Sequence, residues 1–491
     1  MSISTRMKGM SYATAVEKLY SLGHELATHR KWDLEHMRTL AAALGNPERQ
    51  FPAVLIAGTN GKGSTAAALA SICACAGYRT ALYTSPHLVR VNERIQISGK
   101  SPSNTLAAIS DDDFARLYFK VDDTAQRLVS DGALPHPPSF FESMTGLAFA
   151  WFAEQNVEIA IVEIGLGGRL DATNIVQPLL SVITDIALDH TEWLGPTITD
   201  IAREKAGILR HNGTLVTLPQ LPEANHAIGE AAVTLNARGV NAAQYVPARI
   251  STENAALEEI FRNRYSIHVM GETITVDSPL GGVHQQRNLA LAMAAAVDLA
   301  ENHDYKIAPA DIEHGLRQTQ WPGRLELFKT GRAPVLLDVA HNPAGAWALR
   351  AALARLPETM PKTLLFSCLA DKALAEMTQI LLPLFDRTAG DGPQDRILTA
   401  PIENPRAAAV EAIVSAAQSL DTAVEVLPDT RSALARAFEI TPPDGMVVVT
   451  GSIYLVGRVR ELLLPLDNTT AGPSTEPAMS KAEGLGMTEK A

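Results

Sequence analysis

A glycine-rich segment near residue 60 has the residue types that bind a phosphate group. It follows an apolar stretch that ends at Ala57 and opens a helical stretch. Glycines let backbone N–H groups approach phosphate oxygens, a helix N-terminus adds partial positive charge, and Lys62 adds a full charge. The match to the usual phosphate-loop pattern, G-x-x-x-x-G-K-[ST], is imperfect. Ile56 stands where the pattern has its first glycine, and Gly63 separates Lys62 from Ser64. We expect ATP binding, against the alternative of a tight strand–helix turn, by Gly58, Thr59, Asn60, Gly61, Lys62, Gly63 and Ser64.

Three further polar residues are candidates for catalysis. Glu163 ends an apolar run, where a carboxylate is either an ordinary strand-end residue or a Mg²⁺ ligand. His190 holds the equivalent place after the next run, and a structural histidine is its main alternative. Lys205 ends a helical stretch, so its position alone predicts a solvent-facing lysine that suits the helix dipole.

The apolar pattern predicts the scaffold that must position these residues. Short apolar runs alternate with amphipathic stretches, which is typical of an α/β fold. The predicted strands are 54–57, 80–83, 158–164 and 180–186, with helices to about residue 76, over 111–130 and over 140–155. Ligands of open parallel sheets bind beyond the carboxyl ends of the strands. We therefore expect the loops after these strands to form one site.

A second set of strands follows a break in the pattern. We interpret residues 318–323 as a hinge, after which strands are predicted at 335–338, 363–367, 396–399, 424–427 and 446–450. The fold class is thus α/β, with an N-terminal P-loop ATPase-type domain around a mainly parallel sheet and a smaller C-terminal Rossmann-like domain. The predicted boundaries are 1–320 and 321–465. A polar tail rich in Pro, Gly, Ser and Thr, 466–491, is predicted to be disordered.

Composition limits the classes of partner. A formal net charge of -12 argues against an extended nucleic-acid surface. No stretch approaches the roughly 20 apolar residues that span a bilayer, and the N-terminus lacks the apolar core of a signal peptide. The three cysteines, Cys73, Cys75 and Cys368, indicate a reducing compartment. We expect a cytoplasmic monomer that binds neither nucleic acid nor membrane.

Nine segments together resemble folylpolyglutamate synthases and bifunctional dihydrofolate synthases of the Mur ligase superfamily. In chain order they are GTNGKGS, TSPHL, SFFE, VEIGLGGRLDATN, DHTEWLG, EKAGI, HQQRN, WPGRLE and DVAHNP, and the resemblance runs from about Asp33 to about Gly457. It implies an ATP-dependent ligase that joins L-glutamate to dihydropteroate or a reduced folate through an acyl phosphate. It also implies two Mg²⁺ ions and allows a monovalent cation.

The resemblance assigns roles to individual residues. It gives Ser85, Glu163, His190 and a carbamylated Lys205 as metal ligands, Asn288, Arg324 and Asp338 as ATP contacts, and Lys62, Lys205 and His341 as catalytic. For His341, packing against Pro343 is the alternative to a place near the transferred phosphate. The pterin site would contain Ser139, Phe140, Phe141, Glu142, Leu170, Asp171 and Ala172. The two phenylalanines would otherwise be helix core.

Two other functions stay open at this stage. A Mur-type cell-wall ligase shares the nucleotide chemistry, but only about 50 residues precede the phosphate strand, roughly a third of a typical domain. A catalytically inactive nucleotide-binding scaffold is opposed by the intact set of candidate metal ligands. The segment 31–35 resembles the family only loosely, and 247–278 looks like an insertion.

Overall fold

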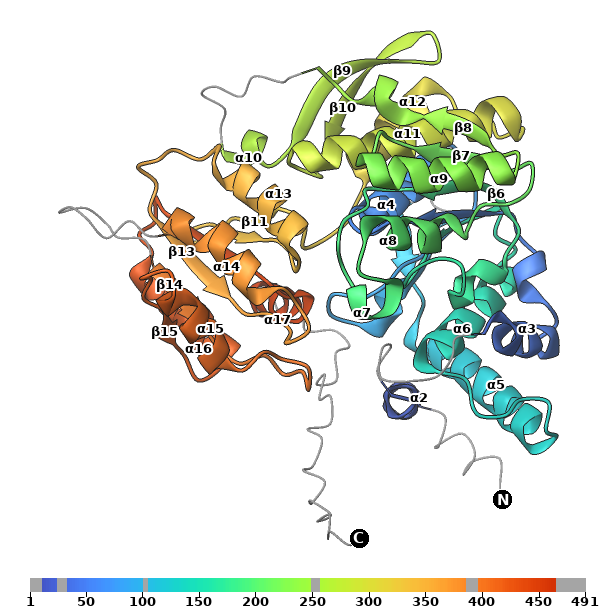
Figure 1. Cartoon of the computed structure of the whole chain (residues 1–491), viewed down its shortest axis with the longest axis horizontal. Coiled ribbons are helices and arrows are strands. Elements are labelled where there is room, and N and C mark those ends of the chain that lie inside the picture. Colours follow the sequence, from blue (N-terminus) through green and yellow to red (C-terminus); the bar gives the residue numbers. More distant parts are fainter. Residues whose placement is uncertain (1–10, 24–32, 100–104, 249–256, 386–395, 465–491) are drawn as a thin grey trace, which may run out of the picture.

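The first part of the chain is built on an eight-stranded, mainly parallel sheet. The computed structural model describes residues 11–23, 33–99, 105–248, 257–385 and 396–464. The strand order is β4-β3-β2-β5-β1-β6-β7-β8 (Figure 1), and only β3 runs opposite to the other strands, in antiparallel pairs with β2 and β4. The strands are β1 Ala53–Ala57, β2 Thr80–Tyr83, β3 Ile95–Ser98, β4 Leu106–Ala108, β5 Ile159–Glu163, β6 Pro178–Ile183, β7 Thr214–Thr217 and β8 Arg238–Asn241.

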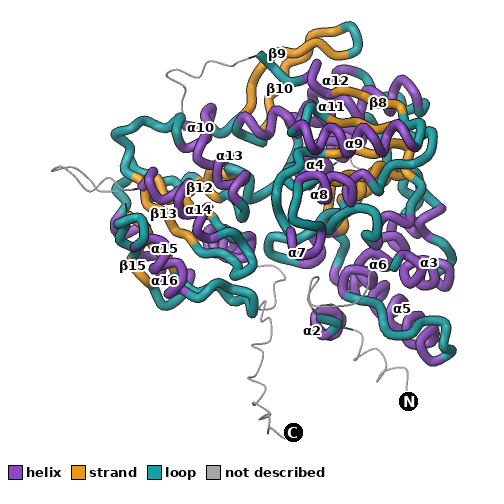
Figure 2. The backbone as a smooth tube through the Cα atoms, in the orientation of Figure 1, coloured by secondary structure: helices purple, strands orange, loops and turns teal. Residues whose placement is uncertain are grey.

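Helices cover both faces of this sheet (Figure 2). Successive strand residues point to opposite faces, so Leu55 joins one apolar cluster while Val54 and Ile56 join the other. The first cluster contains α2 Tyr12–Ser21, α3 Leu34–Ala43, α5 Asp111–Ser130, α6 Phe140–Glu154, α8 Ile198–Ala206 and α9 Pro222–Thr234. The second contains α4 Lys62–Cys75, α11 Val283–Asn302 and α12 Pro309–Gln318. Burial on both faces explains the continuous apolar runs of β1 and β5.

The second part of the chain has its own six-stranded sheet, of order β11-β12-β16-β13-β14-β15. Its strands are β11 Glu326–Phe328, β12 Val335–Leu337, β13 Lys362–Phe366, β14 Arg396–Thr399, β15 Glu425–Val426 and β16 Met446–Thr450, and only β11 is antiparallel. Helices α13 Pro343–Leu353, α14 Leu374–Leu381 and α15 Val410–Gln418 cover one face. Helices α16 Thr430–Ile440 and α17 Ile453–Leu463 cover the other.

The insertion-like region 247–278 contains a β-hairpin. Its strands, β9 Asn263–Val269 and β10 Glu272–Ser278, pair with each other and follow the short helix α10 Leu257–Ile260. Strand β10 lies along α12. The hairpin therefore extends the helical layer at one face of the first sheet.

The α/β class and the mainly parallel sheet are confirmed, and every strand named from the sequence is present. Strand β15 is two residues long rather than four. Strands β3, β4, β7 and β8 were not predicted; they are short and lie toward the edges of the first sheet. The hairpin strands β9 and β10 and the edge strand β11 were not predicted either. The expected hinge is the loop between α12 and β11. The predicted tail 466–491 and residues 31 and 32 lie outside the described residues.

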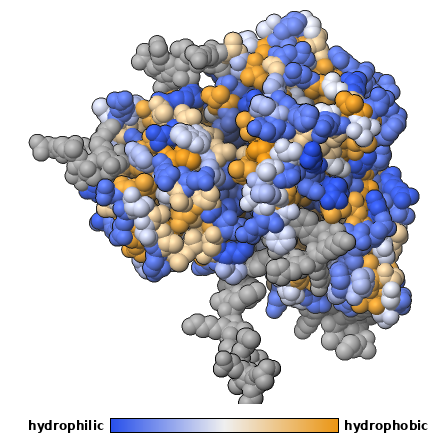
Figure 3. Space-filling model, in the orientation of Figure 1, coloured by the Kyte–Doolittle hydropathy of each residue, from blue (hydrophilic) through white to orange (hydrophobic). Residues whose placement is uncertain are grey.

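The surface is mixed in polarity. On the face in Figure 3, hydrophilic residues dominate and apolar residues form smaller groups. The described helices include none long and apolar enough to cross a membrane.

Candidate active site

Four loops meet at the carboxyl edge of the first sheet, as the sequence predicts. Strands β2, β5, β1 and β6 are consecutive and parallel. The segments that leave them begin with Thr84, Ile164, Gly58 and Thr184. The candidate phosphate loop and metal ligands therefore share one edge.

The phosphate loop bends sharply into α4. Gly61 is the N-cap with φ of 88°, in the left-handed region that favours glycine, and Lys62 is the first helical residue. Lys62 Nζ donates to Thr59 O at 3.2 Å. The Thr59 hydroxyl donates to Ala187 O at 3.0 Å and accepts from Ala187 N–H at 3.1 Å. The loop is thereby fixed to the segment after β6, with the lysine at the helix N-terminus.

Two glycines of this loop allow other elements to approach closely. A Cβ on Gly61 would lie 2.1 Å from Asn288 Oδ1, and a Cβ on Gly63 would lie 2.5 Å from Trp321 Cζ2. Asn288 is buried on α11, where its amide donates to Gln285 at 2.8 Å. Ser64 is also buried, in the first turn of α4. The loop therefore contacts both α11 and the segment between the two sheets.

Glu163 and Ser85 lie together at the ends of neighbouring strands. The Ser85 N–H donates to Glu163 Oε2 at 3.1 Å. Burial raises the pKa of Glu163, and the charge of Lys62 opposes that rise. A buried carboxylate beside a phosphate loop is a suitable ligand for a divalent cation.

Lys205 does not face solvent, so the interpretation from its sequence position is wrong. The end of α8 turns it inward, where only 4% of the residue is exposed. Its Nζ donates to Gly58 O at 2.8 Å. Burial, with the charge of Lys62, lowers the pKa of Lys205 to about 7. An amine with that pKa is partly neutral at physiological pH.

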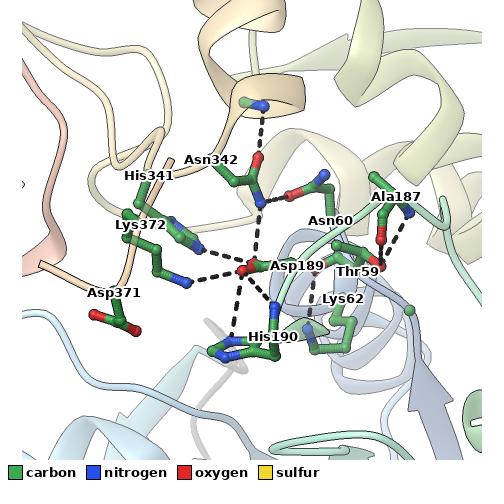
Figure 4. Close-up of polar contacts among 12 residues, drawn as sticks. Thr59, Asn60, Lys62, Ala187, Asp189, His190, His341, Asn342, Asp371 and Lys372 are labelled. Atoms are coloured by element: carbon green, nitrogen blue, oxygen red, sulfur yellow. Dashed lines mark hydrogen bonds and ion pairs between the residues drawn. The ribbon is translucent and has the colours of Figure 1, made fainter. Parts of the chain in front are cut away.

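Asp189 joins the loop after β6 to the second sheet's unit (Figure 4). Lys372 Nζ donates to its Oδ1 at 2.9 Å, and Asn342 Nδ2 donates to its Oδ2 at 3.2 Å. His341 and His190 lie 3.8 and 3.9 Å from its oxygens. Burial alone would raise the pKa of Asp189, but His190, Lys372 and His341 together lower it.

The two histidines differ in their surroundings. Burial lowers the pKa of His190 to about 4, so its ring is neutral at pH 7 and able to bind a metal. His341 Nδ1 lies 2.8 Å from Val339 O, so that nitrogen carries the proton and Nε2 faces Asp189. Desolvation by the surrounding protein, with the charge of Lys372, also lowers the pKa of His341, although 42% of its side chain is exposed.

Arg324 and Asp338 lie where the chain enters the second sheet. Arg324 is over the Trp321 ring at 5.1 Å and donates to Pro322 O at 2.8 Å. Asp338 accepts backbone hydrogen bonds from Leu325 at 3.0 Å and Ala340 at 2.9 Å. Burial nevertheless raises the pKa of Asp338 to about 6. Because the Trp321 ring also lies against Gly63, Arg324 and Asp338 lie on the side of the second sheet that faces the phosphate loop.

The predicted pterin residues separate into two kinds. Phe140 is only 3% exposed, with its ring against Tyr20 and under Arg94, which favours the helix-core interpretation. Phe141 is half-buried, and its ring lies over Gly165 at the end of β5. Phe141 therefore places an aromatic ring next to the carboxyl edge of the first sheet.

The polar members of this set have structural partners. Ser139 and Glu142 form a capping box at the start of α6. Asp171 accepts from Leu166 N–H at 3.0 Å and from the Thr173 hydroxyl, and burial raises its pKa. Leu170 is half-buried and Ala172 buried on either side of it. Asp171 thereby fixes the loop after β5, while Ser139 and Glu142 fix the start of α6.

The predicted metal ligands, Ser85, Glu163, His190 and Lys205, are side chains of four different chemical types. Within the described ranges, no three His, Cys, Asp or Glu side chains form a metal-binding group. The predicted set contains one carboxylate and one imidazole, together with Ser85 and Lys205. It therefore fits Mg²⁺ only if Lys205 supplies oxygen ligands, because Mg²⁺ prefers oxygen.

Sequence reasoning missed Asp189, Asn342 and Lys372. The first two stand inside DHTEWLG and DVAHNP, next to residues that were identified. Asn342 also donates to Asn60 of the phosphate loop at 3.0 Å and caps α13 through Gly345. Lys372 carries no local signal, because its partner is distant in sequence.

Comparison with known proteins identifies the family. Residues 139–296 match the Mur ligase middle domain, and residues 323–453 match the Mur ligase glutamate ligase domain. The folylpolyglutamate synthase of Lacticaseibacillus casei is 32% identical over 470 residues, covering 93% of this chain and 99% of that protein. The dihydrofolate synthase/folylpolyglutamate synthase of Bacillus subtilis is 33% identical over 445 residues, covering 88% and 94%.

Solved structures agree with these sequence relations. Mycobacterium tuberculosis folylpolyglutamate synthase complexed with ADP and AMPPCP has a TM-score of 0.79 at 28% identity, covering 92% of this chain and 99% of that one. Escherichia coli FolC in complex with DHPP and ADP has a TM-score of 0.74 at 28% identity, covering 92% and 97%. The chain belongs to the folylpolyglutamate synthase/dihydrofolate synthase family of Mur ligases.

Proposed function

We propose that this protein is an ATP-dependent ligase that adds L-glutamate to dihydropteroate and to the glutamyl carboxylate of reduced folates. The observation that carries the proposal is the buried Lys205 behind the phosphate loop, at the same sheet edge as Glu163 and Ser85. A lysine with no role beyond solvation would be exposed at the surface, whereas Lys205 is buried. Family membership supplies the substrate class.

The reaction conserves atoms in two steps. An oxygen of the acceptor carboxylate attacks the γ-phosphorus of ATP, which forms an acyl phosphate and releases ADP. The glutamate nitrogen then attacks the acyl carbon, loses a proton, and expels inorganic phosphate as the amide bond forms. Negative charge develops on oxygen in both steps, so positioning and electrostatic stabilisation are the main requirements.

The chain's own groups suit these requirements. Lys62 and the N–H groups at the start of α4 would bind the nucleotide phosphates. Asn288, Arg324 and Asp338 would hold the rest of ATP. The Trp321 ring, which lies between Gly63 and Arg324, would bring Arg324 and Asp338 close to the nucleotide. His341 would lie beside the transferred phosphate, with its free Nε2 directed toward Asp189. We further propose domains of residues 1–320 and 321–465.

The proposed metal ligands are Ser85, Glu163, His190 and carbamylated Lys205. Bound Mg²⁺, proposed as two ions, would neutralise charge on the phosphate oxygens. Carbamylation requires a neutral amine to attack CO₂, and the lowered pKa of Lys205, about 7, supports that chemistry. A monovalent cation is a further proposal from the resemblance alone.

The acceptor would lie beside Phe141, whose half-buried ring can stack on a flat heterocycle. Ser139, Phe140, Glu142, Leu170, Asp171 and Ala172 would shape this pocket. Both activities are proposed, because the SFFE and LDATN segments are present together.

Glutamate-dependent ATP turnover tests the proposal. Purified protein is assayed with glutamate and either 7,8-dihydropteroate or tetrahydrofolate, and the product is identified by mass spectrometry. Turnover with both acceptors supports a bifunctional enzyme, and turnover with one assigns a single activity. Turnover only with a UDP-linked peptide would favour the cell-wall alternative, and none at all would favour a scaffold.

A further inference from the structure

His36 belongs to none of the residue sets above, yet it contacts the Glu142 carboxylate. It lies on α3, which packs against α6. Its Nδ1 is 2.8 Å from Glu142 Oε1, and its Nε2 is 3.0 Å from the His136 carbonyl oxygen. Only 8% of the His36 side chain and 18% of the Glu142 side chain are exposed. The other carboxylate oxygen accepts hydrogen bonds from the N–H and hydroxyl of Ser139, each at 2.8 Å.

Hydrogen-bond donors and acceptors define this pair. A carbonyl oxygen only accepts, so His36 Nε2 carries a proton. Burial raises the pKa of Glu142, but hydrogen bonds from His36 and Ser139 outweigh it, and the pKa is lowered overall. His36 Nδ1 therefore lies against a carboxylate oxygen with a lowered pKa, in a mostly buried pair.

We propose that His36 is a positioning residue for the acceptor substrate, because it fixes the Glu142 carboxylate in the first turn of α6. The inference rests on the proposed function, in which Glu142 and Phe141 belong to the acceptor site. Phe141 precedes Glu142 in that same turn, and its ring lies over Gly165. The recognised class is a flat heterocycle with ring N–H donors, which an oriented carboxylate accepts.

Charged groups on the other elements around α3 have partners of their own. The His136 ring lies against the His36 ring, with centroids 4.5 Å apart. On α3 itself, Glu35 pairs with Arg38, and before β1, Glu48 pairs with Arg49. After β5, Asp171 accepts hydrogen bonds from Leu166 and Thr173. On α5, Asp113 pairs with Arg116, Lys120 with Glu154, and Asp122 with Lys18. The Glu142 carboxylate is directly hydrogen-bonded to the His36 ring.

The test compares the KM for the acceptor with the KM for ATP. His36→Arg supplies a charged donor to the Glu142 carboxylate, so its acceptor KM should stay close to the wild-type value. His36→Gln should raise the acceptor KM about tenfold at neutral pH, the size of one charge-assisted hydrogen bond. The KM for ATP should stay within about twofold, since the hydrogen bonds of His36 described above go to Glu142 and His136, away from the phosphate loop.

His226→Gln is the matched control. His226 also pairs with a glutamate, Glu230 at 3.2 Å, but 73% of its side chain is exposed on α9. This variant should leave both KM values unchanged. A His36→Gln enzyme with a lower melting temperature and unchanged acceptor KM would overturn the inference and leave His36 a structural role. Absence of wild-type turnover would instead overturn the proposed function, and the inference with it.

Discussion

At the scale of single residues, Lys62 tests the phosphate loop. Lys62→Ala removes the cation at the start of α4 but no core packing, because the residue is half-buried at the sheet edge. We expect kcat to fall at least about a hundredfold, the size of losing one electrostatic stabiliser. The melting temperature should change little. A kcat near the wild-type value would exclude this loop as the phosphate site.

Lys205 tests the carbamate. Lys205→Arg and Lys205→Met should both be inactive, because a guanidinium cannot form the carbamate and a thioether has no nitrogen. Loss of the hydrogen bond to Gly58 O should also cost about 1–3 kcal/mol of stability. Labelling with ¹³CO₂ and carbon NMR should show a carbamate signal in the wild type only. An active Lys205→Arg enzyme would contradict the assignment.

The contrast between these two lysines shows what sequence can predict at this scale. Lys62 lies in a local pattern, so its place at a helix N-terminus follows from the neighbouring glycines. Lys205 has no such pattern, since its burial depends on α8 packing beside Gly58, 147 residues away in sequence. Helix-end position alone predicted solvent exposure. Only the resemblance to a family indicated the buried role.

At the scale of elements, the first turn of α6 separates packing from binding. Phe140→Ala empties a core position and should cost about 3–5 kcal/mol of stability. Phe141→Ala removes a half-buried ring beside Gly165, so it should mainly raise the acceptor KM. Thermal melts and acceptor titrations of the pair measure both effects. Equal loss of stability with unchanged KM values would make both rings core residues.

The contact between the phosphate loop and the inter-sheet segment gives a second test. In Gly63→Ala, the new Cβ would lie 2.5 Å from the Trp321 ring, so the ring must move. We expect the KM for ATP to rise about tenfold or more, because Arg324 stacks on the same ring. Gly229→Ala on α9 is the control, since nothing lies within 4 Å of its Cβ. Equal ATP constants in the two variants would contradict the contact's importance.

At the scale of the whole molecule, sequence predicted two sheets but not how they meet. Apolar periodicity is local, so strands such as β12 and β16 could be identified one by one. The contact between the units depends on side chains far apart in sequence, such as Asp189 and Lys372. No spacing rule joins such residues. The sequence therefore predicted the hinge at residues 318–323 but not the side-chain contacts between the two units.

The ion pair between Asp189 and Lys372 should hold the two units together. Both side chains are mostly buried, with 11% and 7% exposed. Lys372→Met would leave a buried carboxylate with only Asn342 and two histidines as partners, and removing one member of a buried pair costs about 3–5 kcal/mol. We expect a larger radius of gyration in X-ray scattering and a lower kcat. Lys120→Met is the control, because its pair with Glu154 is exposed and lies within the first unit. An unchanged radius and kcat in Lys372→Met would mean that apolar contacts alone hold the units in place.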